Sequence, residues 1–98
     1  MSNYIISNAT KEDLIRIHQF GTKKFGSDQA DKYYNDFFEA FNLISKRPFS
    51  FESVDYIRIG YRKCVCGSDT IYFRITDNVV QIITIIEKQD VDRVKNNW

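Results

Sequence analysis

Positively charged side chains and tyrosines gather in one stretch of this sequence, between positions 58 and 74, and continue toward the C-terminus. Guanidinium and ammonium groups bind carboxylates and phosphates through charge-assisted hydrogen bonds, and tyrosine rings offer stacking surfaces beside them. An ordinary solvated sheet face carries the same residue types, so this stretch alone leaves both interpretations open. The candidate binding residues are Arg58, Tyr61, Arg62, Lys63, Tyr72 and Arg74, with Lys88 and Arg93 downstream.

Side chains that commonly carry catalysis or bind metals are scarce. His18 is the only histidine, which excludes a multi-histidine metal site, and its place beside Ile17 on a predicted helix favours a packed or surface histidine over a catalytic base. Cys64 and Cys66 face the same side of one predicted strand, but structural zinc needs four ligands and redox pairs have two intervening residues. We therefore predict no catalytic residues, no metal and no cofactor, and small half-buried cysteines.

The overall charge is close to balance, with 14 Lys and Arg against 13 Asp and Glu and a formal net charge of +1. Because nonspecific nucleic-acid binding relies on many cation–phosphate contacts, we expect no direct, specific nucleic-acid binding. Four acids and one lysine lie between Ser27 and Ser45, whereas four cations and one acid lie between Arg58 and Arg74. Such segments of opposite sign can steer a partner, although two solvated faces would give the same pattern.

The chain has 98 residues, of which 43% are apolar and 15% aromatic, which suffices for one hydrophobic core. We expect a single domain over residues 1–98, with a polar tail at 87–98. No apolar run approaches the roughly 20 residues of a membrane span, and the first residues lack a secretory leader. Two closely spaced cysteines do not make a disulfide framework. These features predict a cytoplasmic protein of a reducing compartment, with no membrane contact.

The N-terminal half predicts a short strand at 4–7 and two helices. Thr10 to Asp13 resembles a capping box, and apolar residues at helical spacing continue to Phe25, where Gly26 ends the first helix. Ser27 and Asp28 suit the start of a second helix, which runs almost to Pro48. A short turn makes the two helices pack antiparallel as a hairpin. Its core should be the aromatic row Tyr33, Tyr34, Phe37, Phe38 and Phe41.

The C-terminal half changes to the alternation of strands. Residues 48–56 suggest a loop whose Phe49 and Phe51 lie against the hairpin, and strands are expected at 61–65, 70–76 and 79–86. The last of these is apolar on both faces, as in a strand covered from both sides. The hairpin covers one face, so we expect a second chain on the other. The resulting fold class is α+β: an N-terminal strand and a helical hairpin packed on a mostly antiparallel C-terminal sheet.

Residues along nearly the whole chain resemble one family in order. The C-terminal half contributes residues 57–63, then Gly67 and Ser68, then residues 71–75, and the end contributes residues 90–93. The helical hairpin contributes Ala9, Asp13, Leu14, Ile17, Phe25, Gly26, Gln29, Ala30 and Tyr33. This ordered combination resembles the ParE family of plasmid-stabilisation toxins, within the RelE/ParE superfamily. Where that family commonly has two histidines, this chain has Asp69 and Glu87.

The resemblance implies the toxin of a type II toxin–antitoxin module, with the RelE/ParE fold. Members of the family bind a ParD-like antitoxin, and characterised ParE toxins poison DNA gyrase without being enzymes. The cationic and tyrosine residues named above would then contact the target. The predicted antitoxin-binding residues come from the two-faced last strand and the tail: Val80, Ile82, Ile86 and Trp98.

Two other functions fit the same fold. A RelE-like, ribosome-dependent mRNA endonuclease would need proton-moving and phosphate-stabilising groups, which Arg62, Lys63, Tyr72, Arg74 and Lys88 could supply. The second is an antitoxin-bound relic that has lost its activity. A net charge of only +1 favours the gyrase hypothesis over the ribosome-dependent one, because binding to ribosomes favours a strongly basic protein.

Overall fold

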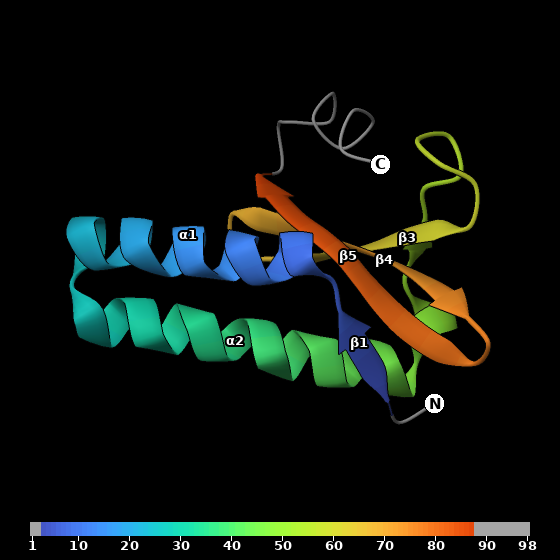
Figure 1. The fold of residues 1–98 in the computed structure, drawn as a ribbon, viewed down its shortest axis with the longest axis horizontal. Coiled ribbons are helices and arrows are strands. Elements are labelled where there is room, and N and C mark those ends of the chain that lie inside the picture. The colour runs from blue at the N-terminus through green and yellow to red at the C-terminus, as the bar shows by residue number, and fades with distance from the viewer. Residues whose placement is uncertain (1–2, 88–98) are drawn as a thin grey trace.

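Two helices of similar length lie side by side and cover one face of a sheet (Figure 1). The computed structural model describes residues 3–87 of the chain. Its elements are β1 (Tyr4–Ile6), α1 (Asn8–Phe25), α2 (Ser27–Lys46), the short 3₁₀ helix η1 (Pro48–Ser50), β2 (Glu52–Ser53), β3 (Tyr61–Cys66), β4 (Asp69–Thr76) and β5 (Val79–Glu87). The expected α+β class is confirmed, and β2 is an additional short strand inside the expected 48–56 loop. No helix within residues 3–87 is long and apolar enough to cross a membrane.

The start of α1 differs from the expected capping box. Ser7 is the N-cap, and its hydroxyl accepts a hydrogen bond from the Thr10 amide at 3.0 Å. Thr10 lies inside the helix, fully buried, and donates its hydroxyl to the Ile82 carbonyl at 3.2 Å. The predicted cap at Thr10 is therefore wrong, since a serine three residues earlier already satisfies the free amide. Ser27 likewise belongs to α2 itself, whose N-cap Gly26 makes no side-chain hydrogen bond.

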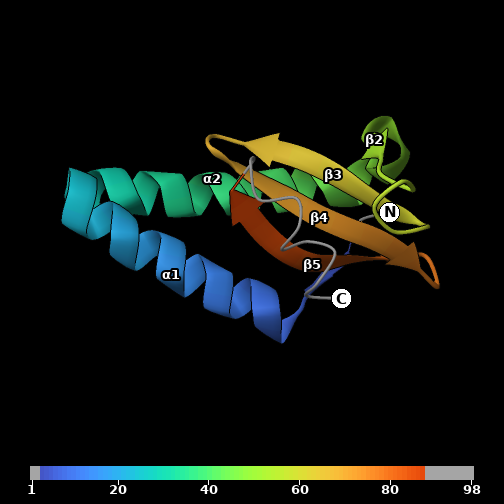
Figure 2. The same ribbon diagram turned by 90° about the horizontal axis from the view of Figure 1, so that it is seen from above.

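The sheet has the order β1-β5-β4-β3-β2, so β1 lies beside β5 (Figure 1). Figure 2 shows β5, β4 and β3 following one another across the sheet. β1 pairs with β5 in parallel, with Tyr4 opposite Val80, and the other three pairings are antiparallel. The turn between β4 and β5 uses Asp77 and Asn78 at φ 52° and 62°, values that suit a two-residue hairpin. The predicted mostly antiparallel sheet and this turn are confirmed.

The main core lies between the hairpin and the sheet. Phe37 and Phe41 of α2 are fully buried there against Ile71 and Phe73 of β4, which the alternation of that strand had placed on one face. The predicted aromatic row therefore forms part of the core. Phe51 also packs against this core, but Phe49 is 68% exposed, so the expectation that both lie against the hairpin holds only for Phe51.

A second apolar cluster covers the opposite face of the sheet. It contains Val54, Tyr61, Tyr72 and Ile86, all at most 5% exposed, with Ile57 and Ile83 packed beside them. The segment between β2 and β3 thus folds over the face that we expected a second chain to cover. The expectation of a second chain is wrong for Ile86 of β5, because Val54 and Ile57 of this same chain pack against it.

β1 pairs with β5 only as far as Ile82, and side chains at the start of α1 hydrogen-bond to the rest of that strand edge. The Ser7 hydroxyl donates to the Ile83 carbonyl at 2.6 Å. Asp13 Oδ2 accepts hydrogen bonds from the Thr84 hydroxyl at 2.7 Å and from the Ile85 amide at 2.9 Å. Backbone groups that would otherwise lack a partner strand are therefore satisfied by helix side chains, which fixes α1 in register with β5.

Candidate binding surfaces

Four of the predicted binding residues lie together on the sheet face that points away from the helices. Strand pairing places Tyr61 opposite Arg74 and Lys63 opposite Tyr72, and both tyrosines belong to the second apolar cluster. Because paired residues of adjacent antiparallel strands share a face, these side chains form one patch, which we call the basic sheet face.

Tyr61 forms the floor of this patch between two guanidinium groups. The Cζ atoms of Arg58 and Arg74 lie 5.8 and 6.0 Å from the centre of its ring, within the range of cation–π attraction. Arg74 also donates from Nε to Gln81 Oε1 at 2.7 Å. These contacts hold two positive charges in place over a ring that is itself only 5% exposed.

Lys63 and Tyr72 complete the patch. Lys63 forms an ion pair with Glu52 at 3.7 Å, and most of the Glu52 side chain is solvent-exposed, so this pair contributes little stability. Tyr72 is 4% exposed, and burial, followed by the nearby Tyr56 and Glu52, raises the pKa of its hydroxyl. The two tyrosines therefore support the patch from below and offer a partner little surface.

Arg62 lies on the other face of the sheet. Its register partner is Phe73 of the main core, its Nη1 donates to the Phe51 carbonyl at 2.7 Å, and its Cζ lies 5.2 Å from the centre of the Phe49 ring. The sequence had suggested one continuous cluster, but neighbouring residues of a strand point to opposite faces, so that cluster is split. Lys88 and Arg93 lie outside the described residues.

Three of the four residues predicted to bind an antitoxin are buried. Val80, Ile82 and Ile86 have no exposed area: the first two lie in the core under the hairpin, and Ile86 lies in the second cluster. Direct contact with a partner through these side chains is incompatible with the folded chain, so this assignment is corrected. Trp98 lies outside the described residues.

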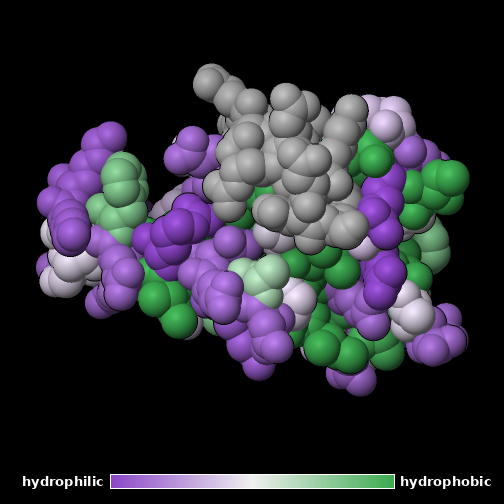
Figure 3. Space-filling model, turned by 45° about the horizontal axis from the view of Figure 1, so that its top comes forward, coloured by the Kyte–Doolittle hydropathy of each residue, from purple (hydrophilic) through white to green (hydrophobic). Residues whose placement is uncertain are grey.

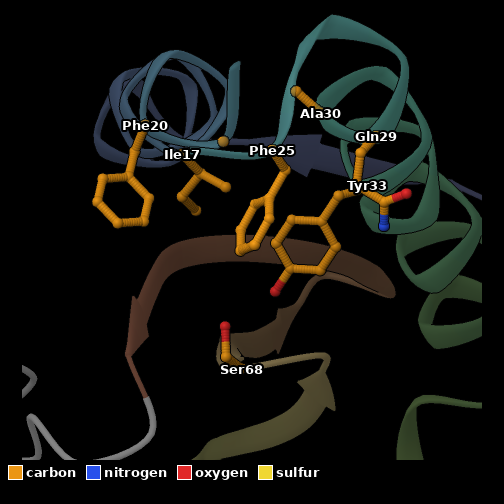
Figure 4. A pocket seen from close by; sticks show the side chains of 8 residues that line it. Ile17, Phe20, Phe25, Gln29, Ala30, Tyr33 and Ser68 are labelled. Carbon is orange, nitrogen blue, oxygen red and sulfur yellow. The ribbon is translucent and has the colours of Figure 1, made fainter. Parts of the chain in front are cut away.

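A pocket of about 210 Å³ opens instead at the tip of the helical hairpin (Figure 4). Phe20 and Phe25 at its rim are 61% and 62% exposed. The sequence placed Phe25 on the helical stripe of the first helix, but the structure leaves its side chain exposed because the helix tip extends beyond the sheet. Phe20 was missed, although an aromatic residue off that stripe was a signal for an exposed apolar site. The pocket is lined by Ile17, Phe20, Gly21, Phe25, Gln29, Ala30, Tyr33 and Ser68.

A buried polar junction lies beside this pocket. Tyr33, whose ring points toward Ser68 in Figure 4, places its hydroxyl 2.8 Å from both the Cys66 carbonyl and Asp69 Oδ2. Asp69 is 5% exposed and pairs in register with Glu87, so two acids face each other across the strands. Burial is the main cause that raises the pKa of Asp69, and Glu87 adds to it, whereas the Tyr33 hydrogen bond lowers it. The pKa of Tyr33 is also raised, mainly by burial.

Residues 4–91 match the family model for the ParE toxin of the type II toxin–antitoxin system parDE. The chain belongs to the ParE toxin family. It is 31% identical over 94 residues to Toxin ParE1 of Mycobacterium tuberculosis, with 94% of this chain and 96% of that protein covered. Toxin ParE1 of Caulobacter vibrioides is 27% identical over 88 residues, covering 90% and 91%.

A solved structure from a chromosomal ParDE system of P. aeruginosa shares the fold of this ParE-family chain. The TM-score is 0.79 at 18% identity, and the alignment covers 89% of this chain and 96% of the other. The fold that the resemblance implied is thus confirmed by an independent comparison of three-dimensional structures.

The histidine and the two cysteines lie away from the basic sheet face in this ParE-family member. His18 joins the two helices through Asp31, with 2.7 Å between Nε2 and Oδ1, and packs edge-on against Tyr34. Cys64 and Cys66 are half-buried against the main core, as predicted. Burial raises the pKa of both thiols, that of Cys66 to about 11, so both are protonated at neutral pH.

Proposed function

We propose that this ParE-family chain acts on DNA gyrase by binding, without being an enzyme, and that a ParD-like antitoxin neutralises it in the cytoplasm. The observation that carries the proposal is the pair of guanidinium groups fixed over Tyr61. It provides a preorganised charged surface, and the single histidine lies on the hairpin, on the other side of the sheet. Such a surface suits charge-assisted contacts with an acidic partner.

The pocket at the hairpin tip is the surface that we assign to the antitoxin. Similarity to a protein of a ParDE system supports an antitoxin as the partner. Phe20 and Phe25 leave more than half of each ring in water, and covering them would remove on the order of 200 Å² of apolar surface. At about 25 cal/mol per Å², this burial contributes roughly 5 kcal/mol before the costs of association.

Activity is tested first with the chain alone. Its expression in bacteria should stop growth, and co-expression of the antitoxin encoded beside it should restore growth. Purified chain should block supercoiling by gyrase and accumulate cleaved DNA. Cleavage of mRNA on translating ribosomes with gyrase unaffected would overturn the proposed target and favour the endonuclease alternative, and no effect in either assay would indicate a relic.

The two surfaces are then separated by mutation. Arg74→Ala should weaken gyrase inhibition roughly 10- to 150-fold, because a charge-assisted contact is worth roughly 1.5–3 kcal/mol, while antitoxin binding stays unchanged. Lys11→Ala removes an exposed cation on α1 and is the matched control. Conversely, Phe20→Ser with Phe25→Ser should weaken antitoxin binding and leave gyrase inhibition intact. If both variants affect both partners equally, the assignment of two separate surfaces is wrong.

A further inference from the structure

The loop of residues 54–60, between β2 and β3, is held in one conformation by its own hydrogen bonds. The Val54 amide donates to the Tyr61 carbonyl at 2.8 Å, and the Gly60 amide donates to Asp55 Oδ1 at 2.8 Å. Gly60 has φ 85°, a value that favours glycine, and Val54 anchors the loop with a fully buried side chain. A loop built in this way presents its outward side chains at fixed positions.

The outward side chains of this end of the molecule are unusually apolar. Ile59 is 87% exposed and Phe49, from η1, is 68% exposed. They border a hollow of about 410 Å³ whose lining also includes Ile75 at the end of β4 and Arg62 on β3. Figure 3 shows hydrophobic surface next to strongly hydrophilic surface at this end, on the right of the view.

Among its described lining residues the hollow has one cation, Arg62, and two further cations, Arg58 and Arg74, lie over the ring of its lining residue Tyr61. The Arg62 guanidinium lies over the Phe49 ring and is fixed by its hydrogen bond to the Phe51 carbonyl. Within residues 3–87, Asp55 is the acid that lines the hollow, and its Oδ1 accepts a hydrogen bond from the Gly60 amide of the same loop. The hollow therefore combines the apolar side chains of Phe49 and Ile59 with an oriented cation, which can pair with a carboxylate in a planar, two-point contact.

We propose that this hollow receives a large apolar side chain of the target protein, flanked in that protein by an acidic residue. The inference rests on the proposed function and extends it, because it places an apolar anchor beside the basic sheet face. Interfaces gain most of their affinity from a few anchors that fill pockets, with charges around them setting orientation.

Gyrase inhibition by variants at Ile59 tests the inference. Because Ile59 is almost fully exposed, Ile59→Ser should leave folding and antitoxin binding unchanged while weakening gyrase inhibition about tenfold. The matched control is Leu43→Ser, which removes an apolar side chain that is 51% exposed on α2. Equal inhibition by the two variants and the wild type overturns this inference alone, whereas a wild type without effect on gyrase overturns the proposed function as well.

A charge pair at the same position tests the chemistry of the occupant. Ile59→Asp should weaken inhibition more than Ile59→Lys, because an aspartate both repels an acidic segment and competes for Arg62. The reverse order would overturn the acidic occupant. Sedimentation of wild type and Ile59→Ser tests a second copy as occupant: a dimer lost on substitution, with gyrase inhibition unchanged, would overturn the proposal.

Discussion

Among the acidic residues of the two helices, Asp13 is the one whose substitution should lower stability most, because its carboxylate accepts hydrogen bonds from two donors of β5. Asp13 is 8% exposed and accepts from the Thr84 hydroxyl and the Ile85 amide through one oxygen. Hydrogen bonds to charged groups contribute about 1.5–3 kcal/mol each. Since both share one oxygen and a hydroxyl can rotate to another acceptor, we expect Asp13→Ala to cost about 2–4 kcal/mol, less than the sum.

Urea unfolding of the purified chain, followed by circular dichroism, measures this cost. For a domain of this size, a loss of about 2–4 kcal/mol lowers the melting temperature by roughly 10–25 °C. Glu12→Ala, an exposed acid on the same turn, is the control and should change stability by at most about 0.5 kcal/mol. A double-mutant cycle of Asp13→Ala with Thr84→Val should give a coupling of about 1 kcal/mol. Equal effects of the two acids, or zero coupling, would refute the reasoning.

Three further predictions concern the junction beside the hairpin pocket. Because the pKa of Asp69 is raised above its usual 3.8, its ionisation opposes folding: the stability that this group contributes is fully present below pH 3.8 and is lost as pH rises through the folded value. The unfolding free energy of Asp69→Asn minus that of the wild type should therefore increase from pH 4 to pH 7, and a constant difference would contradict this. Gly67→Ala should lower the melting temperature, since φ is 59° and a Cβ would lie 2.5 Å from the Tyr33 ring; no change would show that the turn adjusts. Replacing both Cys64 and Cys66 with Val should leave antitoxin binding and toxicity within a few-fold, at about 1 kcal/mol of repacking each, and stoichiometric zinc in the wild type would disprove this.

Local sequence patterns correctly predicted which helices and strands form, but not which distant segments pack against them. The alternation of Ile71 and Phe73 correctly gave the face of β4 that meets the helices. The cap of α1 was misplaced because Ser7 and Thr10 both suit a helix start, and only the contact of Thr10 with the Ile82 carbonyl, far along the chain, decides between them. Elements follow from short-range periodicity, whereas caps that depend on a distant strand do not.

For the candidate site, too, short-range sequence patterns identified residue types, whereas tertiary packing decided which of them lie together. Residues near one another in sequence were grouped into one cationic cluster, but the pleat of β3 sends Arg62 and Lys63 to opposite faces. The burial of Ile86 required Val54 to fold back over the sheet, which no periodicity in either segment indicates. The exposure of Phe25 at the rim of the hairpin pocket depends on how far α1 extends past the sheet, which is a property of tertiary packing.

The parallel pairing of β1 with β5 has a consequence for the order of folding. The first strand of the chain has no neighbour until the last strand is present, and α1 also bonds to β5. Contacts between residues so far apart in sequence form late and slowly, because the whole intervening chain must be ordered first. A nascent chain emerging from the ribosome therefore cannot complete its sheet before β5 has been synthesised, and a fragment truncated before Val79 would leave β1 without its partner strand and α1 without its hydrogen bonds to β5.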